Sequence, residues 1–159
     1  MVDGHQNRRL FLIRSAGLVA AAASVTVLPV AAGRATPQMM QDAIRKIVGE
    51  ATLQRGRVTI DMPPLVENGN AVPVTVSVDS AMTDADRVVA VHIVNEKNPQ
   101  PQVISAALGP RAGRARLATR IKLADSQQIV AIAEMKDGSF WSESADVIVT
   151  IAACVEDVN

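Results

Sequence analysis

Hydrophobic residues alternate with polar ones along most of the chain after residue 56, and this two-residue period predicts β-strands. The clearest example is residues 72–78, where four valines take every second position. Because successive side chains of a strand point to opposite faces, the pattern indicates a strand buried on one face only. Residues 58–62 and 115–123 repeat it, and Val147, Val149 and Ile151 repeat it near the end of the chain.

Three further runs predict strands of a different character. Arg87 to Val94 is apolar on both faces, which is typical of a central strand. Gln102 to Leu108 is a weaker strand, Ile129 to Met135 a stronger one, and Ser139 to Glu143 leads into the last strand. Turn and loop residues separate these runs at Pro63-Pro64, Glu67-Asn68-Gly69-Asn70, Asn95 to Pro101, Gly109-Pro110, Asp125-Ser126 and Asp137-Gly138.

The rhythm of the strands predicts the fold class. Seven or eight short strands follow one another at a spacing of about ten residues, as in an all-β, immunoglobulin-like antiparallel β-sandwich. The cysteine pair and central tryptophan of antibody domains are missing. The fold class is therefore predicted, but the order of the strands in the sheets is not.

One short helix is expected before the first strand. Thr36 and Pro37 form an N-cap followed by proline at the first helical position. Apolar residues then recur with helical spacing until Gly49, which ends the helix; they are Met40, Ala43, Ile44, Ile47 and Val48. Such a helix either covers one end of a sheet or binds a partner.

The N-terminus has the features of an export signal. Arg8 and Arg9 stand in the twin-arginine pattern Asn7 to Leu12, and an alanine-rich apolar stretch, Ala16 to Ala32, follows. That stretch is too short and too weakly hydrophobic for a good membrane anchor, so we expect no stable membrane insertion. The predicted organisation is a twin-arginine (Tat) signal peptide at 1–32, a β-sandwich at 33–154 and a short polar tail at 155–159, with the mature protein in the periplasm.

Charge and composition exclude one class of partner. Cleavage near Ala32 leaves 13 basic and 15 acidic residues, a formal net charge of about −2. The chain has neither a basic run nor a set of aromatic residues on which bases could stack, so nucleic acid is not an expected partner. One predicted strand has a basic outer face, formed by Arg114, Arg116, Arg120 and Lys122. This face is either an ordinary soluble surface or a landing site for acidic partners or small anions.

The residues offer little for catalysis. After export the chain would hold one histidine, His92, and one cysteine, Cys154, which is too few for a metal site of two histidines and a cysteine. His92 stands in an apolar strand and is expected to be a structural residue there. No glycine-rich phosphate loop is present, and the carboxylates are scattered. We expect no metal, no cofactor and no enzyme activity.

Cys154 is the exception among these residues. It follows the last predicted strand and lies five residues from the end of the given sequence. In an oxidising compartment a lone thiol stays free, bonds to another molecule or is buried.

Several short motifs, taken in order, resemble the SoxY family, the sulfur-carrier subunits of the periplasmic thiosulfate-oxidising Sox system. They are Pro63 to Gly69 with Val72-Pro73-Val74, Asn98 to Pro101, Thr119 to Ala124, Asp137-Gly138-Ser139 and Val149 to Cys154. Together they span nearly all of the chain after the signal. The resemblance implies an immunoglobulin-like sandwich that pairs with a SoxZ subunit as a heterodimer.

The resemblance also implies a role for the thiol. Cys154 takes the position of the cysteine to which thiosulfate-derived sulfur species are attached, with Ala152 and Ala153 as the arm beside it. The carrier then visits a c-type cytochrome that loads it, a hydrolase that releases sulfate, and a sulfur dehydrogenase.

The C-terminus departs from the family pattern. The family cysteine commonly lies in Gly-Gly-Cys-Gly-Gly, whereas here Ala152-Ala153-Cys154 precedes Val155-Glu156-Asp157-Val158-Asn159. Alanine is stiffer than glycine, and the five extra residues could extend about 17 Å beyond the thiol. Glu156 and Asp157 disfavour the thiolate, so we expect a less reactive sulfur unless a partner supplies positive charge.

Two hypotheses of function follow. The first is a non-catalytic sulfur carrier that acts through Cys154. The second is a periplasmic binding or assembly module that keeps the scaffold but has lost sulfur shuttling.

Overall fold

The computed structural model describes residues 36–153, which lie within Ala32–Asn159, the second of the two units into which the chain divides. The predicted signal peptide with Arg8 and Arg9, the thiol of Cys154 and the tail 155–159 lie outside the described residues. The elements in chain order are α2 (Pro37–Val48), β1 (Leu53–Gln54), β2 (Val58–Asp61), β3 (Leu65–Asn68), η1 (Gly69–Ala71), β4 (Val72–Val78), β5 (Val88–Asn95), β6 (Gln102–Ala107), β7 (Arg116–Ile121), β8 (Gln127–Met135) and β9 (Phe140–Ile151).

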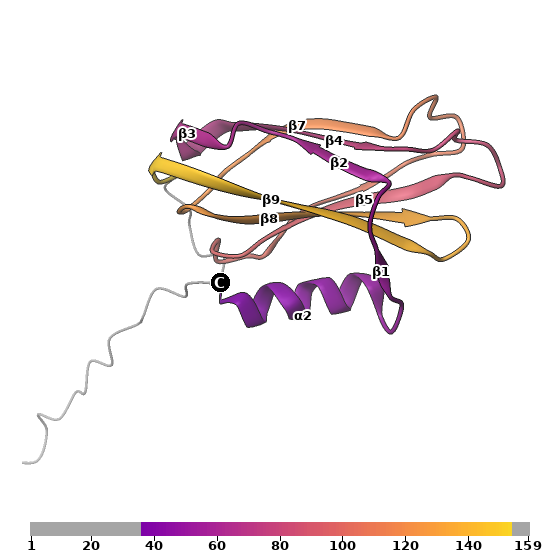
Figure 1. The fold of residues 1–159 in the computed structure, drawn as a ribbon, viewed down its shortest axis with the longest axis horizontal. Helices are drawn as coiled ribbons and strands as arrows, with labels where there is room; N and C mark the ends of the chain where they lie inside the picture. The colour runs from indigo at the N-terminus through magenta and orange to yellow at the C-terminus, as the bar shows by residue number, and fades with distance from the viewer. Residues whose placement is uncertain (1–35, 154–159) are drawn as a thin grey trace, which may run out of the picture. The chain divides into compact units, whose positions relative to one another are not determined.

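The strands form two sheets that pack face to face (Figure 1). The larger sheet has the order β1-β9-β8-β5-β6, with β3 also paired to β9, and the smaller has the order β2-β4-β7. Most neighbouring strands are antiparallel. The predicted all-β sandwich is therefore confirmed.

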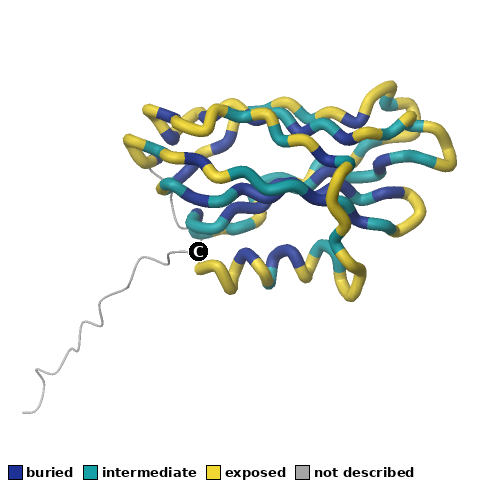
Figure 2. Tube along the Cα trace, viewed as in Figure 1, coloured by how far each residue is buried: buried dark blue, intermediate teal, exposed yellow. Residues whose placement is uncertain are grey.

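The core between the sheets is built from the alternating valines and isoleucines. In β4 all four valines face inward and are buried, as their spacing predicts. β5 lies between β6 and β8 and is the central strand that its apolar sequence predicts. Figure 2 shows the buried positions running along the facing sides of the two layers. Each fully buried Val or Ile side chain stabilises the fold by about 1.5–3 kcal/mol.

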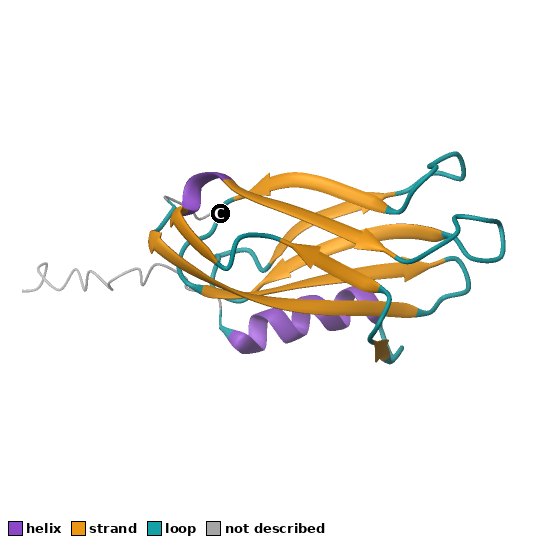
Figure 3. Ribbon diagram, turned by 45° about the horizontal axis from the view of Figure 1, so that its top comes forward, coloured by secondary structure: helices purple, strands orange, loops and turns teal. Residues whose placement is uncertain are grey.

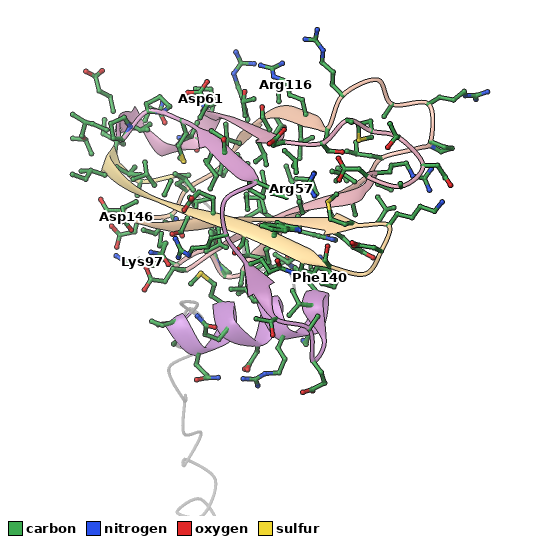
Figure 4. All side chains as sticks on the ribbon, turned by 45° about the vertical axis from the view of Figure 1, so that its right-hand side comes forward. Arg57, Asp61, Lys97, Arg116, Phe140 and Asp146 are labelled. Atoms are coloured by element: carbon green, nitrogen blue, oxygen red, sulfur yellow. The ribbon has the colours of Figure 1, made fainter. Side chains whose placement is uncertain are left out.

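The predicted helix is present and packs on the outer face of the larger sheet (Figure 3). The Thr36 hydroxyl accepts a hydrogen bond from the Met39 amide at 3.3 Å, and Gly49 ends the helix at φ 61°. Met40, Ala43 and Ile44 are buried against the sheet, where Phe140 lies between strand and helix (Figure 4). The helix therefore covers a sheet face rather than a sheet end.

One local prediction was wrong, and two features of the sheets were not predicted. Residues 65–68 form β3, although Glu67 and Asn68 were expected in a turn, and only Gly69 to Ala71 turn. The short strands β1 and β3 both run parallel to β9. The last strand is also one continuous element that starts at Phe140. These pairings join segments distant in sequence, so a local two-residue period does not reveal them.

Among the described residues, no helix is long and apolar enough to cross a membrane.

Candidate functional site

The strand that leads to Cys154 is held on one side by β3. Leu65 is paired with Ile148, Val66 with Val149, and Asn68 with Ile151. The Ile148 amide also donates to the carbonyl of Pro64 at 2.9 Å. Because Val66 is buried in the core and Val149 packs against the core, the pairing is supported by side chains as well as by the backbone.

A serine holds the other side of the same strand. The Ser126 hydroxyl accepts a hydrogen bond from the Val149 amide at 2.9 Å and lies 3.4 Å from the Val149 carbonyl, to which it donates. One hydroxyl thereby satisfies both backbone groups of Val149, which would otherwise lack a strand partner at this edge.

Two backbone hydrogen bonds fix the residue before Cys154. The Ala153 amide donates to the Leu123 carbonyl at 2.9 Å, and the Leu123 amide donates to the Gly69 carbonyl at 2.9 Å. Leu123 is completely buried and Ala153 is 8% exposed, whereas Ala152 is exposed. We call Gly69, Leu123, Ser126, Val149 and Ala153 the arm base. The chain is thus anchored at the residue immediately before the candidate thiol.

Gly69 is required at the arm base for steric reasons. A Cβ atom built on it would lie 2.4 Å from the Leu123 carbonyl oxygen and 2.9 Å from the Ala153 nitrogen. Both neighbours are backbone atoms that are themselves held in place. Only glycine lets the turn after β3 approach the end of the chain this closely.

The loop that carries Asn98 supports the arm base from behind. Asn98 is 8% exposed; its side-chain amide donates to the Lys122 carbonyl at 2.8 Å and its carbonyl accepts from the Ala124 amide at 3.0 Å. These two bonds bracket Leu123. The buried Gln127 amide donates to the same Asn98 oxygen at 3.0 Å, and its carbonyl accepts from the Lys97 amide at 2.8 Å.

The sequence predicted the loop that carries Asn98, as an exposed loop and as part of a family motif. It assigned no role at the site to Gly69, Leu123, Ser126, Asn98 or Gln127. The sequence signal for them was weak. Asn-Gly reads as an ordinary turn, and a loop asparagine reads as a solvent-exposed residue until the structure shows it buried.

His92 lies in β5 as expected, within a small polar cluster. Its Nδ1 is 2.7 Å from the Ser105 hydroxyl of β6, and its Nε2 is 3.7 Å from the Glu134 carboxylate of β8. Burial lowers the pKa of His92, and the negative charge of Glu134 opposes this shift only in part. Within residues 36–153 no group of three His, Cys, Asp or Glu side chains could hold a metal ion.

The basic face lies on the outer side of the smaller sheet. Arg114, Arg116, Arg120 and Lys122 are all exposed, and Figure 4 shows Arg116 on that side. None of these four side chains forms an ion pair with another described residue. The predicted orientation of the strand is confirmed, whereas a binding role for this face stays a prediction.

Comparison with known proteins identifies the family. The model of the family described as sulfur oxidation protein SoxY matches residues 44–154. The chain belongs to the SoxY family. The match extends over the whole described sandwich except the first residues of α2, and it includes Cys154.

Solved structures agree with this membership. The sulfur carrier protein SoxY from Chlorobium limicola f thiosulfatophilum has a TM-score of 0.60 and 26% identity, over 72% of this chain and 98% of that one. A superoxide reductase (neelaredoxin) from Ignicoccus hospitalis has a TM-score of 0.53 and 18% identity, over 59% of this chain and 80% of that one. At that identity the second similarity concerns the fold alone. Among curated proteins, no match was found.

Family and structural match together support a carrier role in sulfur oxidation, with partners from the sulfur-oxidation system. A carrier is not a catalyst, which is consistent with the prediction that the chain is not an enzyme.

Proposed function

We propose that this SoxY-family chain is a periplasmic carrier that binds thiosulfate-derived sulfur covalently on Cys154 and presents it to Sox enzymes. The observation that carries the proposal is the family match, which runs to Cys154, the only cysteine in the sequence. The arm base adds support, because it would hold the residue before the thiol at a defined point on the sandwich.

The chemistry asked of Cys154 is bond formation at sulfur. Joining the cysteine sulfur to the outer sulfur of the thiosulfate dianion releases one proton, from the thiol, and two electrons, and the c-type cytochrome of the system would accept the electrons. Hydrolysis of the terminal sulfonate then consumes one water, releases sulfate and leaves a persulfide on Cys154. The sulfur dehydrogenase would act on that persulfide.

The remaining parts of the proposal concern location and assembly. Arg8 and Arg9 would direct export of the folded protein by the Tat pathway, and a SoxZ-like subunit would complete a heterodimer. Ala152 and Ala153 would keep the approach to the thiol narrow, since both side chains are small.

Intact-protein mass spectrometry of the mature protein from cells grown on thiosulfate tests the proposal. We expect a mass increase that reductant removes and that the Cys154→Ser variant lacks. A bare thiol that also resists alkylation in the folded protein would contradict the carrier role. That result would favour a binding or assembly module that no longer shuttles sulfur.

A further inference from the structure

Large apolar side chains are exposed at the end of β9, where a soluble sandwich would ordinarily be polar. Leu65 is 60% exposed, Ile148 61% and Ile151 63%. The fourth exposed large apolar side chain of the described residues, Met39, lies on α2 at 42%. The exposed apolar residues are therefore concentrated on the β3–β9 pair, and the end of β9 is exposed in Figure 2.

These three side chains flank the strand on both faces. Leu65 and Ile148 are register partners, so they lie side by side on one face. Ile151 is three residues further along β9 and so points to the opposite face. We call Leu65, Ile148 and Ile151 the apolar strand end. A partner that buried all three would have to receive the strand end in a cleft, because a flat surface reaches one face only.

The tether between this strand end and the thiol is short. Ala153 is bound to the buried Leu123 carbonyl, and the Cα atom of the next residue lies about 3.8 Å further along the chain. Cys154 is three residues from Ile151, a span of at most about 11 Å. While the hydrogen bonds of the arm base stay intact, an enzyme whose active site reaches the Cys154 sulfur must therefore also contact the apolar strand end.

We propose that the apolar strand end is the docking surface for the enzymes that act on the sulfur bound to Cys154. The proposal rests on the function proposed above and adds the kind of partner surface. The matching surface on the enzyme is the mouth of its active-site channel. The walls of this mouth are apolar and contact β9 on both faces. Its rim carries positive charge, because exposed Glu67 on β3 would approach it.

The test uses the triple variant Leu65→Thr, Ile148→Thr and Ile151→Thr in the complex with the SoxZ-like subunit. Threonine keeps β-propensity while removing apolar surface. With the purified Sox cytochrome and thiosulfate, we expect kcat/KM for loading of Cys154 to fall by about tenfold or more, mainly through KM, because the burial of even one such side chain is worth that much. Alkylation of Cys154 by iodoacetamide should proceed at the unchanged rate.

Two controls separate docking from other effects. Met39→Gln removes an exposed apolar side chain from α2 and should load normally. Two glycines inserted between Ala153 and Cys154 lengthen the tether by about 7 Å. The thiol can then enter an active site without the strand end reaching its mouth, so in the lengthened arm the triple substitution should lower loading less than it does in the native arm.

The outcomes distinguish this inference from the proposed function. Normal loading of the triple variant would overturn the docking surface and leave the carrier role intact. Loss of the heterodimer in that variant, seen by size-exclusion chromatography, would assign the strand end to the subunit interface instead and would also overturn it. If the triple variant does not fold, the single variant Leu65→Thr takes its place. It should raise the KM for loading of Cys154, and an unchanged KM would count against the docking surface. Absence of any loading in the wild-type complex would contradict the proposed function itself.

Discussion

At Gly69 the backbone of the turn after β3 comes closer to Leu123 and Ala153 than any side chain allows. The close approach joins three segments that are far apart in sequence. It makes a glycine in an ordinary-looking Asn-Gly turn part of the support for the C-terminal arm.

We predict that Gly69→Ala destabilises the protein by about 1–3 kcal/mol, the usual cost of overpacking a site whose neighbours cannot move. The measurement is urea unfolding, in which the midpoint should fall while the m-value stays constant. Gly113→Ala is the matched control, because a Cβ at Gly113 meets nothing within 4 Å. Equal midpoints for the two variants would show that the turn can adapt.

His92 makes stability depend on pH. Burial lowers its pKa in the folded protein, whereas in the unfolded chain it titrates near about 6.5. As the pH falls through that value the unfolded state takes up the proton first, so the free energy of unfolding decreases, and it levels off below the folded pKa.

We therefore predict that His92→Gln flattens the pH profile of unfolding between pH of about 7.5 and 5.5, measured by urea unfolding. Glu134→Gln should steepen the profile, because it removes the charge that favours the protonated ring. If the free energy of unfolding changes with pH in the same way in the wild type and in His92→Gln, His92 is not the source of the pH dependence.

At the scale of elements, the loop after β5 and the start of β8 together position the arm base. Asn98 in the loop after β5 binds the backbone on both sides of Leu123, and Gln127 at the start of β8 binds Asn98. The Asn98 loop therefore influences the position of Ala153 indirectly: it holds Leu123, and the Leu123 carbonyl accepts the hydrogen bond from the Ala153 amide.

We predict that Asn98→Ala lowers the free energy of unfolding by about 2–4 kcal/mol, since it leaves buried polar groups without partners. Hydrogen exchange should also speed up at the Ala153 amide. Gln100→Ala, an exposed change in the same loop, should alter neither quantity. An unchanged exchange rate at the Ala153 amide in Asn98→Ala would show that the loop does not help to position the arm base.

At the scale of the whole molecule, unpaired basic side chains gather on the outer side of the smaller sheet, which also carries exposed Asp61, and in the loop that leads to β7. Arg111, Arg114, Arg116, Arg120 and Lys122 are exposed and form no ion pair with another described residue. Most other described basic residues are paired, among them Arg45, Arg57 and Lys136. A local excess of basic side chains raises association rates with acidic partners, and salt weakens the effect.

We predict that Arg116→Glu with Arg120→Glu slows association with an acidic Sox partner by about tenfold at low salt, and that the difference disappears at high salt. The control is Lys46→Glu with Arg55→Glu, which changes the net charge equally but away from this face. Stopped-flow mixing gives the rates. If both double variants slow association equally, net charge alone is responsible and the face is an ordinary soluble surface.

Local pattern was enough to predict most of the elements. The valine alternation of β4, the doubly apolar β5 and the capped α2 each report their surroundings through their own residues, because burial on one face imposes a period on the sequence. The pattern failed for β3, where Glu67 and Asn68 looked like a turn. It also failed at Ile151, which continues the alternation of β9 but is 63% exposed because the core ends before it.

The sequence by itself determined the β-sandwich class, the helix that precedes the strands, the candidate thiol at Cys154 and, through its ordered motifs, the family. Only the tertiary structure decided that β3 runs parallel to β9, that Gly69, Leu123 and Ser126 hold the strand before the thiol, and that Asn98 is buried behind them. The physical reason is the range of the interactions. Periodicity and capping arise between near neighbours along the chain, whereas the arm base is made of contacts between segments brought together when the two sheets pack.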